Sequence, residues 1–314
     1  MRLRTGLAVL PFFLVPLVAC APQDDDSGSD ASDDNTSSSS PSEEPTDVPS
    51  ESASPTEEAT ETGGLSLECA ADQLNVKSAG FLTVGTDSPA YEPWFVDNDP
   101  SNGQGYESAV AYAVADTLGM QVQWVKVPFN TSYKPGAKDF DFDINQISIT
   151  PERAEVVDFS DGYYAAAQAV IALEDSDIAT STSIGDLAFF KLGAQTGTTS
   201  LTAIRDTIKP DDEPAVFEDT NAAKQALLNG QVDGIVADLP TAFYITAAEI
   251  KHSVIVGQFQ PVTGEQEEFG MLFEKGNPLV TCVNEALAVL TADGTLDQLQ
   301  QQWLSNEVDV PVLQ

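Results

Sequence analysis

The segment ISITPERAEVVDFS (147–160) places an arginine in the first turn of an expected helix. Thr150 is typical of a helix N-cap, because its hydroxyl can accept a free backbone N–H, and Pro151 suits the first helical position. Arg153 follows in the same turn, although the positive end of the helix dipole mildly disfavours a cation there. Free N–H groups and a guanidinium that point the same way form a site for an anion. This segment alone favours neither that site nor a surface ion pair with one of three nearby carboxylates, Glu152, Glu155 and Asp158.

Two further strand ends carry polar groups that complement an anion site. The turn Gly197-Thr198-Thr199-Ser200 opens an expected helix with hydroxyls and free N–H groups, and Asp238 ends the expected strand DGIVAD. Two polar helix starts and an arginine suit a carboxylate, whereas an aspartate suits an ammonium group. Together these groups predict a site for a free α-amino acid. Each also has an ordinary interpretation, because Thr198, Thr199 and Asp238 could serve only as helix caps.

These residues are positioned by alternating strands and helices. Apolar runs between turn signals predict strands at 80–87, 121–127, 140–149, 168–173, 214–219, 232–238 and 253–259. Helical spacing predicts helices at 105–119, 220–231 and 239–250, a strand, turn and helix at 191–206, and a strand with two helices at 269–304. Short connections between alternating strands and helices indicate an α/β protein with parallel sheets, in which ligands bind at the carboxyl ends of the strands.

The strand and helix pattern starts twice, at TVGTD and at LGAQTGT, which predicts two similar lobes. We expect residues 65–167 and 267–314 to form the first lobe and residues 168–266 to form the second. The chain then crosses between the lobes near Gln168 and again near Gln266, and the two crossings make a two-segment hinge. With the lobes face to face, their strand ends line one cleft.

Residues 1–20 are typical of a lipoprotein signal peptide. Two arginines precede an apolar stretch, residues 6–19, which is too short to span a bilayer and is interrupted by prolines. The stretch ends in LVAC (17–20), which is similar to the bacterial lipobox, so Cys20 is the predicted lipidation site and membrane anchor. The alternative is an ordinary secreted protein with a chance cysteine.

Residues 21–64 are predicted to form a disordered acidic tether. They are rich in Ser, Thr, Pro, Asp and Glu and contain no Lys, Arg or aromatic residue, so they cannot bury enough apolar surface to fold. The whole chain has a formal net charge of −37, and residues 65–314 alone contain 37 acidic and 11 basic residues. Nucleic-acid binding needs a basic surface, so this charge argues against a nucleic-acid partner.

Two cysteines remain in the expected folded part, Cys69 and Cys282. In an exported protein a lone pair of cysteines is more often a disulfide than a metal site or a catalytic thiol, so we predict a Cys69–Cys282 disulfide. The single histidine, His252, lies between a predicted helix and a predicted strand, which argues against a Ser-His-Asp hydrolase. No Cys, His and Asp cluster has metal-ligand spacing, and the Gly-rich turns match no nucleotide fingerprint, so we expect no metal and no cofactor.

From about residue 72 to residue 305, the chain resembles the extracytoplasmic amino-acid-binding proteins of bacterial ABC importers, the polar amino-acid branch of the solute-binding proteins. The most specific segment is NQISITPERAEVVDFSDGYY, which is similar to the family's strand, Ser-x-Thr step, helix with arginine and Phe-Ser-x-x-Tyr-Tyr run. The resemblance implies a two-lobed, periplasmic-binding-protein-like α/β fold, each lobe a mostly parallel sheet flanked by helices. It implies ligand-binding roles for ten residues: Asp87, Tyr91, Trp94, Phe129, Ser148, Thr150, Arg153, Thr198, Thr199 and Asp238.

The resemblance also assigns roles within that set. Ser148, Thr150, Arg153 and Thr199 would hold the ligand's α-carboxylate, and Asp238 would hold its α-ammonium group. Phe129 matches an aromatic residue that stacks over the ligand, and Asp87, Tyr91 and Trp94 match ligand-facing positions after the first strand.

The sequence differs from the family where the ligand's side chain should lie. Asn145 and Gln146 stand in place of two small hydroxyl residues, and the loop after the first strand is one residue longer. These differences leave the identity of the amino acid open. Two acidic residues of that loop, Asp87 and Glu92, favour a neutral polar or basic amino acid over an acidic one.

The resemblance implies partners as well as a ligand. We expect a monomer that binds a free amino acid, delivers it to the permease subunits of an ABC importer and is held at the outer face of the cell membrane by its lipid. One alternative is a ligand-sensing lipoprotein without transport. A second is a dehydratase-like enzyme on the same fold that uses only carboxylates, Asp87 or Glu92, although we expect no enzymatic activity.

Overall fold

The computed structural model describes residues 64–261, 266–304 and 310–314, which belong to one compact unit, Ala59–Gln314. The expected signal peptide (1–20), its lipidation site Cys20 and all but the last residue of the expected tether (21–64) lie outside the described residues.

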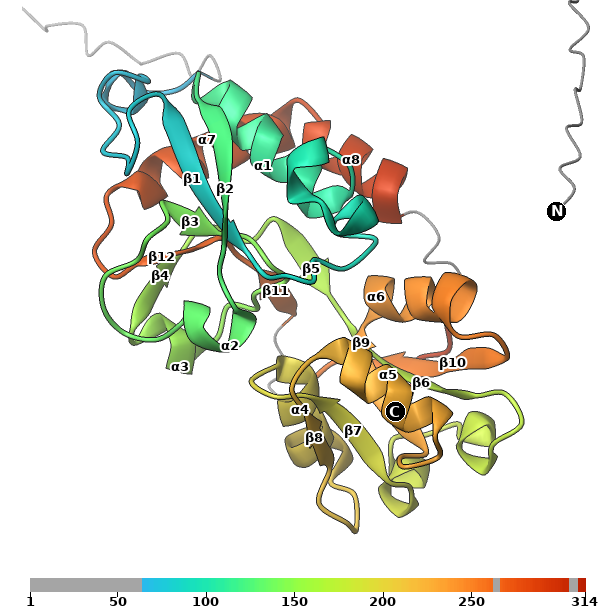
Figure 1. Ribbon diagram of the computed structural model, residues 1–314. Coiled ribbons are helices and arrows are strands. Elements are labelled where there is room, and N and C mark those ends of the chain that lie inside the picture. The colour runs from blue at the N-terminus through green and yellow to red at the C-terminus, as the bar shows by residue number, and fades with distance from the viewer. Residues whose placement is uncertain (1–63, 262–265, 305–309) are drawn as a thin grey trace, which may run out of the picture. The chain divides into compact units, whose positions relative to one another are not determined.

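The first lobe is built on a five-stranded sheet in the order β2-β1-β3-β12-β4 (Figure 1). Its strands are Gln121–Lys126 (β2), Phe81–Thr86 (β1), Phe142–Asp143 (β3), Leu272–Glu274 (β12) and Val157–Phe159 (β4). β1 is parallel to β2 and β3, whereas β12 is antiparallel to both β3 and β4. All strands but β12 therefore run in one direction, and their carboxyl ends meet at one edge.

Three helices pack together on this sheet, α1 (Tyr106–Thr117), α7 (Leu279–Ala292) and α8 (Thr295–Leu304) (Figure 1). Val84 of β1, Val114 of α1 and Leu287 of α7 are almost wholly buried in the core that these elements share. Burying such a side chain stabilises the fold by roughly 1.5–3 kcal/mol. Two short helices, α2 (Phe129–Ser132) and α3 (Pro151–Ala154), follow β2 and β3 at the other end of the sheet.

The second lobe also has a five-stranded sheet, in the order β10-β6-β9-β7-β8. Its strands are Ser253–Phe259 (β10), Gln168–Leu173 (β6), Gly234–Asp238 (β9), Leu192–Gln195 (β7) and Ala215–Phe217 (β8). β6 is antiparallel to β10 and β9, whereas β7 is parallel to β8 and β9. The expectation of mostly parallel sheets is thus met in both lobes, with one reversed strand in each.

Helices cover both faces of the second sheet. Val170, Val236 and Leu201 share a core with α4 (Thr199–Ala203), whereas Ile171 and Ile235 share a core with α5 (Thr220–Leu228) and α6 (Leu239–Tyr244). Neighbouring residues of one strand point to opposite faces, so β6 and β9 bury apolar side chains on both sides. This explains why both strands are continuous apolar runs in the sequence.

A two-stranded antiparallel ribbon links the lobes, β5 (Tyr164–Ala166) paired with β11 (Glu267–Phe269). The ribbon is the expected two-segment hinge, and β6 begins directly after β5. The proposed lobe boundaries at 167/168 and 266/267 stay a prediction. Residues 310–314 were assigned to the first lobe, but they contact the second lobe. Val312 bridges Gln258 of β10, and Leu313 is buried in the second lobe's core.

Some predicted elements are shorter than expected. The predicted strand 140–149 is a strand only at Phe142–Asp143, because Gln146 has a left-handed backbone (φ 48°) that interrupts extended structure. The helix predicted at the end of 191–206 and the helix predicted at 239–250 start as α4 and α6 but end in single π-helical turns, Ile204–Ile208 and Ile245–Glu249. A hinge of two segments was predicted, but the bounds of its strands β5 and β11 were not.

The predicted disulfide between Cys69 and Cys282 is confirmed (S–S 2.02 Å, Cα–Cα 5.2 Å). Cys69 precedes β1, and Cys282 lies in α7, so the bond joins two parts of the first lobe that are 213 residues apart. In the chain-entropy model, closing so long a loop stabilises a fold by roughly 4–5 kcal/mol.

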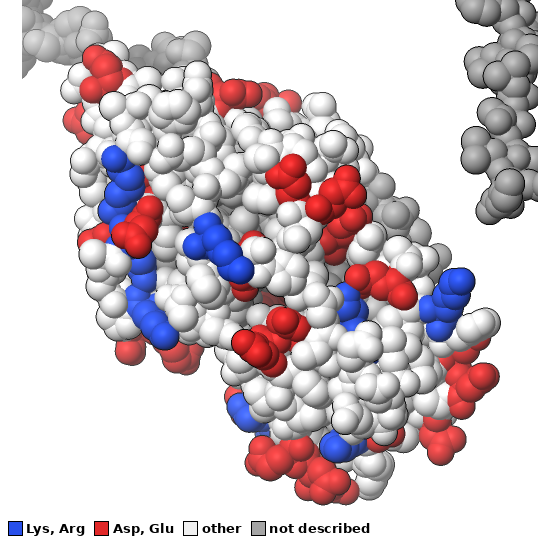
Figure 2. All heavy atoms as spheres, in the orientation of Figure 1, with Lys and Arg blue, Asp and Glu red and all other residues white. Residues whose placement is uncertain are grey.

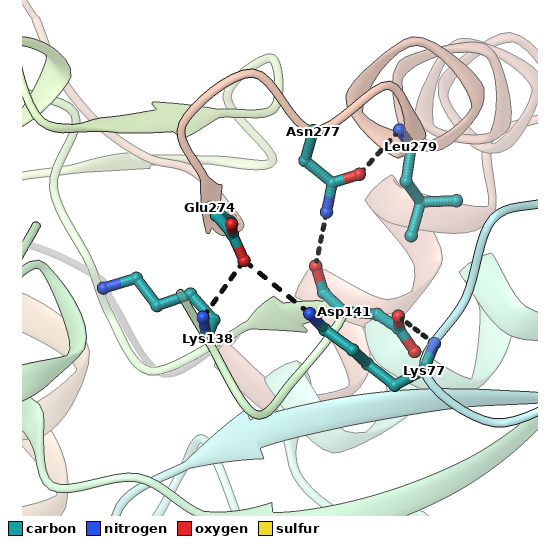
Figure 3. Close-up of polar contacts among 6 residues, drawn as sticks. All are labelled: Lys77, Lys138, Asp141, Glu274, Asn277 and Leu279. Carbon is teal, nitrogen blue, oxygen red and sulfur yellow. Dashed lines mark hydrogen bonds and ion pairs between the residues drawn. The ribbon is translucent and has the colours of Figure 1, made fainter. Parts of the chain in front are cut away.

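A polar cluster in the first lobe connects four segments of the chain (Figure 3). The Asp141 carboxylate accepts the backbone N–H groups of Lys77 (2.8 Å) and Thr83 (2.7 Å). Glu274 accepts the backbone N–H of Lys138 (3.1 Å), and its carboxylate lies 3.7 Å from the Lys77 ammonium group. These contacts connect β1 and β12 to the loops around them, so we assign the cluster a structural role.

Figure 2 shows one face of the protein, on which basic side chains are scattered among acidic ones and form no continuous patch. Within the described ranges, no single helix is long and apolar enough to cross a membrane. Among the described helices, α7 and α8 taken together reach that length and apolarity, and they are bent by 77°.

Candidate ligand-binding site

A cavity lies between the two lobes, at the carboxyl ends of β1, β7 and β9. Its lining residues are Asp87, Tyr91, Phe129, Asn145, Gln146, Gln195, Thr198, Thr199, Ser200, Thr220, Ala223, Ile235, Val236, Ala237, Asp238 and Thr241. Six of the ten residues predicted from the sequence are in this lining. The other four, Trp94, Ser148, Thr150 and Arg153, are not.

Asp87 and Phe129 are fixed by each other at the first-lobe side of the cavity. Asp87 follows β1 directly, and its carboxylate accepts the backbone N–H of Phe129 (3.0 Å) and of Ser88 (2.6 Å). These bonds hold the start of α2 beside the end of β1. Phe129 is buried, so its ring forms a wall of the cavity.

Tyr91 brings a hydroxyl without a partner to the cavity. Its oxygen is buried and has no hydrogen-bond partner among the described residues. Burial raises the pKa of Tyr91, and the nearby carboxylate of Asp219 raises it further. The group therefore stays neutral and can donate a hydrogen bond to a ligand.

Trp94 lies elsewhere than the sequence predicts. Its ring is fully buried in the first lobe, with edge-to-face contacts to Tyr106, Tyr164 and Phe269 at centroid distances of 5.4–6.0 Å. Its indole N–H donates to the Thr241 hydroxyl of the second lobe (2.8 Å). Trp94 therefore contacts Thr241, which lines the cavity, but does not line the cavity itself. Its large ring is held at the centre of an aromatic cluster.

Arg153 connects the two lobes beside the cavity. The side chain is buried, and its two terminal nitrogens donate to the backbone carbonyls of Ser148 (2.7 Å) and Gly197 (2.9 Å). The guanidinium carbon also lies 5.0 Å from the centroid of the Tyr133 ring. This arrangement contradicts the interpretation of Arg153 as a surface ion pair.

Ser148 and Thr150 hold the loop that carries Arg153. The Thr150 hydroxyl accepts the backbone N–H of Arg153 (3.2 Å), which confirms the predicted N-cap, with Pro151 at the first helical position. The Ser148 hydroxyl donates to Glu267 (2.6 Å) and lies 3.1 Å from the Thr199 hydroxyl of the second lobe. The loop therefore touches the second lobe at Gly197 and Thr199.

The turn at 197–200 combines capping with contact to the other lobe. Thr198 accepts the backbone N–H of Leu201 (3.1 Å), so its ordinary interpretation as an N-cap is correct, although it also lines the cavity. Gly197 has a left-handed backbone (φ +76°), and a Cβ there would lie 2.3 Å from the Tyr133 hydroxyl. Only glycine permits this approach between the lobes.

Asp238 lines the cavity from the end of β9. It stands at the N-cap position of α6, but its side chain forms no cap hydrogen bond and instead accepts the Gln168 amide (2.9 Å). The interpretation of Asp238 as only a cap is therefore wrong. Burial raises its pKa well above the usual range, and the nearby Glu267 carboxylate adds to this shift. A cation in the cavity would favour the ionised form.

Sequence reasoning missed two residues that join the hinge to the site. Gln168, the first residue of β6, is fully buried, and its amide donates to both Asp238 and Glu267 (2.9 Å each) and accepts from Ser200 (2.6 Å). Glu267, in β11, also accepts from Ser148. Gln168 is the one polar residue of the apolar run 165–173, which was a signal for a buried polar role, whereas Glu267 lies in a polar segment and gave none.

Glu107 was also missed, although the sequence contains a signal for it. It lies in α1 on the face of Val110 and Val114, and it is wholly buried. Its carboxylate accepts the backbone N–H of Gln146 (2.6 Å) and the Tyr163 hydroxyl (2.5 Å). A lone acid on an apolar helix face indicates a buried network, because an unpaired buried charge is costly.

Comparison with known proteins identifies the class to which this fold and cavity belong. Residues 82–306 match the family model of the bacterial extracellular solute-binding proteins, family 3, and the chain belongs to this family. The match spans both lobes and confirms the resemblance stated from the sequence.

The relatives are described as binding proteins. The L-cystine-binding protein TcyJ of Escherichia coli (strain K12) is 28% identical over 251 residues, which are 78% of this chain and 91% of that protein. The structure of an ancestral arginine-binding protein bound to glutamine is 30% identical, with a TM-score of 0.62 over 73% of this chain and 100% of that one. The ancestral amino acid-binding protein AncCDT-1, a precursor of cyclohexadienyl dehydratase, is 33% identical, with a TM-score of 0.60 over 72% and 95%.

Proposed function

We propose that this protein is a receptor that binds a free amino acid in the cavity between its lobes and delivers it to an ABC importer. The observation that carries the proposal is the position of a basic and an acidic side chain beside one cavity, Arg153 from the first lobe and Asp238 from the second. The α-amino acid group has the complementary pair of charges. Relatives with this fold are described as binding cystine and glutamine.

Closure of the lobes would complete the site. Arg153 and Ser148 already reach Gly197 and Thr199 of the second lobe, at the turn proposed to hold the carboxylate. Asp238 would receive the ammonium group, which replaces the weak neutral contact from the Gln168 amide with a charged one. Water is excluded from a closed cleft, and the interaction between unit charges strengthens as the local dielectric falls.

Binding without catalysis is the function that the site favours. The enzyme alternative has one supporting neighbour, the precursor of cyclohexadienyl dehydratase, whose title names it as an amino acid-binding protein. Asp87, the proposed catalytic carboxylate of that alternative, has both its oxygens bonded to backbone N–H groups. Those bonds hold it as an acceptor that fixes the loop rather than as a proton carrier.

We propose further that Cys20 is lipidated and anchors the protein outside the cell, with residues 21–64 as its tether. The support is the sequence LVAC at the end of a short apolar stretch. Mass spectrometry of the protein extracted from membranes should find a diacylglycerol-modified N-terminal Cys20. A peptide that begins elsewhere, from protein free in the medium, would contradict the anchor.

The experiment that tests the receptor proposal is a thermal-shift screen of the full-length chain against the common amino acids. A ligand at a hundredfold excess over its Kd should stabilise the folded state by about 2.7 kcal/mol. A rise of the melting temperature with one or a few amino acids supports the proposal. No shift with any amino acid at millimolar concentration would contradict it.

A further inference from the structure

One part of the cavity is lined by three amide side chains to which the proposed function gives no role. Asn145 and Gln146 lie on the first-lobe side, and Gln195 lies on the second-lobe side beside the Thr220 hydroxyl. Neither lysine nor arginine is found among the described residues that line the cavity. If the charged ends of the amino acid lie at Arg153 and Asp238, these amides remain for its side chain.

Glu107 fixes the orientation of Gln146. The left-handed backbone of Gln146 (φ 48°) is a conformation that non-glycine residues rarely adopt, and its backbone N–H donates to Glu107 (2.6 Å). The side-chain NH2 of Gln146 donates to the other oxygen of the same carboxylate. Because the NH2 of the Gln146 amide is held by Glu107, the free end of the amide is its oxygen. The cavity wall therefore presents a fixed acceptor.

Asn145, the preceding residue of the chain and also part of the cavity lining, supplies a donor. The residue is 6% exposed, and its side-chain nitrogen is buried without a hydrogen-bond partner in the described part of the chain. An unpaired buried donor costs free energy, so a ligand that supplies an acceptor there gains affinity. Across the cavity, the Gln195 oxygen accepts from the Thr220 hydroxyl (3.0 Å), which leaves the NH2 of Gln195 as a second donor.

We propose that Asn145 and Gln146 form a side-chain subsite that selects amino acids ending in a carboxamide, with Glu107 as its positioning residue. This inference rests on the proposed function. The carbonyl of a carboxamide accepts from Asn145, and its NH2 donates to the Gln146 oxygen. A guanidinium or ammonium group only donates and leaves Asn145 unpaired. A carboxylate only accepts and faces the Gln146 oxygen and Asp87 without a cation to balance it.

Isothermal titration calorimetry of the full-length chain with matched ligand pairs tests the subsite. L-Glutamine is compared with L-glutamate, L-asparagine with L-aspartate, and L-arginine is measured alone. The tighter of the two amides should bind at least about tenfold more tightly than its acid and than L-arginine, because each mismatch leaves a buried polar group unpaired.

Asn145→Asp replaces the donor with an acceptor of the same shape. Affinity for the preferred amide should fall about tenfold to a hundredfold, while affinity for L-arginine should hold or rise. Asn229→Asp is the matched control, because it makes the same charge change at an exposed position of the second lobe. It should leave all affinities unchanged.

Glu107→Gln tests the positioning role through a ratio of affinities. The new amide can still accept the Gln146 backbone N–H and the Tyr163 hydroxyl, but its NH2 now faces the Gln146 side chain. The Gln146 amide should turn over and present its NH2 to the ligand. The amide-to-acid affinity ratio should therefore fall at least about fivefold. If Glu107 had a merely structural role, the variant would bind both the amide and the acid more weakly by the same factor, and the ratio of affinities would stay unchanged.

The outcomes separate this inference from the function on which it rests. Binding of amino acids with a preference for arginine or for an acid, or an unchanged preference in both Asn145→Asp and Glu107→Gln, overturns the carboxamide subsite alone. Binding of no amino acid at all overturns the proposed function as well.

Discussion

We propose Arg153 and Asp238 as the residues that recognise the α-amino acid group, and their surroundings explain why neither is an ordinary surface charge. Arg153 is buried and donates to two backbone carbonyls, which satisfy two of its N–H groups without neutralising its charge. Burial lowers the pKa of Arg153, and nearby Tyr133, Glu267 and Asp238 oppose that shift. The guanidinium therefore remains a cation with unsatisfied attraction for a carboxylate.

Asp238→Asn should weaken amino-acid binding about a hundredfold, because removal of one partner of a buried charge pair costs about 3 kcal/mol or more. The asparagine can still accept the Gln168 amide, so the fold should be retained. Titration calorimetry measures the loss, and Asp212→Asn, an exposed aspartate of the same lobe, is the control. Equal affinity of Asp238→Asn and wild type would show that the ammonium group is bound elsewhere.

The buried carboxylates predict how stability depends on pH. Burial raises the pKa of Glu107 from 4.5 to about 7, despite hydrogen bonds from Tyr163 and Gln146 that lower it. A group whose pKa is raised on folding binds its proton more tightly in the folded state. Its contribution to stability is complete below about pH 4.5 and is lost as the pH rises through about 7. Burial raises the pKa of Asp143 and Asp238 as well, so they act in the same direction.

Glu107→Gln should therefore flatten the pH dependence of the unfolding free energy. In wild type, the Glu107 contribution falls by about 3 kcal/mol between pH 4.5 and pH 7. Urea unfolding at several pH values in this range measures the difference, with ligand absent. Parallel curves for the variant and wild type would mean that Glu107 titrates normally.

At the scale of elements, the strands and long helices could be predicted from the sequence, whereas the local interruptions could not. Apolar runs such as QAVIAL and helical spacing in 105–119 reflect burial, which the sequence records directly. The early end of β3 depends on Gln146, whose left-handed backbone is held by Glu107, a residue 39 positions away. The hinge pair β5 and β11 likewise depends on pairing between segments about 100 residues apart.

The candidate site, too, could be predicted where it depends on local sequence and not where it depends on distant segments. Asp87 and Asp238, which end predicted strands, line the cavity, because parallel strands bring their carboxyl ends together. Trp94 does not line it, because its indole is held by aromatic neighbours from three other segments. Gln168 and Glu267 were missed, because only the hinge brings them beside Asp238.

The turn before α4 gives a prediction about lobe closure. Gly197→Ala would place a Cβ 2.3 Å from the Tyr133 hydroxyl and 2.9 Å from the Asn130 side chain, both in the first lobe. The lobes should then close less fully, and affinity for the amino acid should fall about tenfold or more, since Arg153 and Ser148 no longer meet Gly197 and Thr199 across the cleft.

Gly230→Ala is the matched control for this variant. Gly230 also has a left-handed backbone (φ +66°), but a Cβ at this position would have no atom within 4 Å among the described residues. Both variants should lose about 1 kcal/mol of stability from backbone strain, measured by urea unfolding. Only Gly197→Ala should lose affinity, and equal affinity of the two variants would contradict the closure argument.

At the scale of the whole folded unit, one cavity lies between two lobes, and a narrow two-stranded ribbon connects the lobes. The ribbon of β5 and β11 is the paired connection, and residues 310–314 return to the second lobe after α8 of the first. The disulfide joins only first-lobe elements, so it stabilises that lobe without restraining the hinge. Such a division allows each lobe to move as a body about the ribbon.

We propose that the cavity binds a free zwitterion, with Arg153 on the carboxylate and Asp238 on the ammonium group. Calorimetry with the best amino acid, its α-amide and its N-acetyl derivative tests this most directly. Each derivative removes one charge and keeps the side chain, so each should bind about a hundredfold or more weakly than the parent. Equal affinity for all three would contradict the account, because the site would then recognise something other than the charged ends of an amino acid.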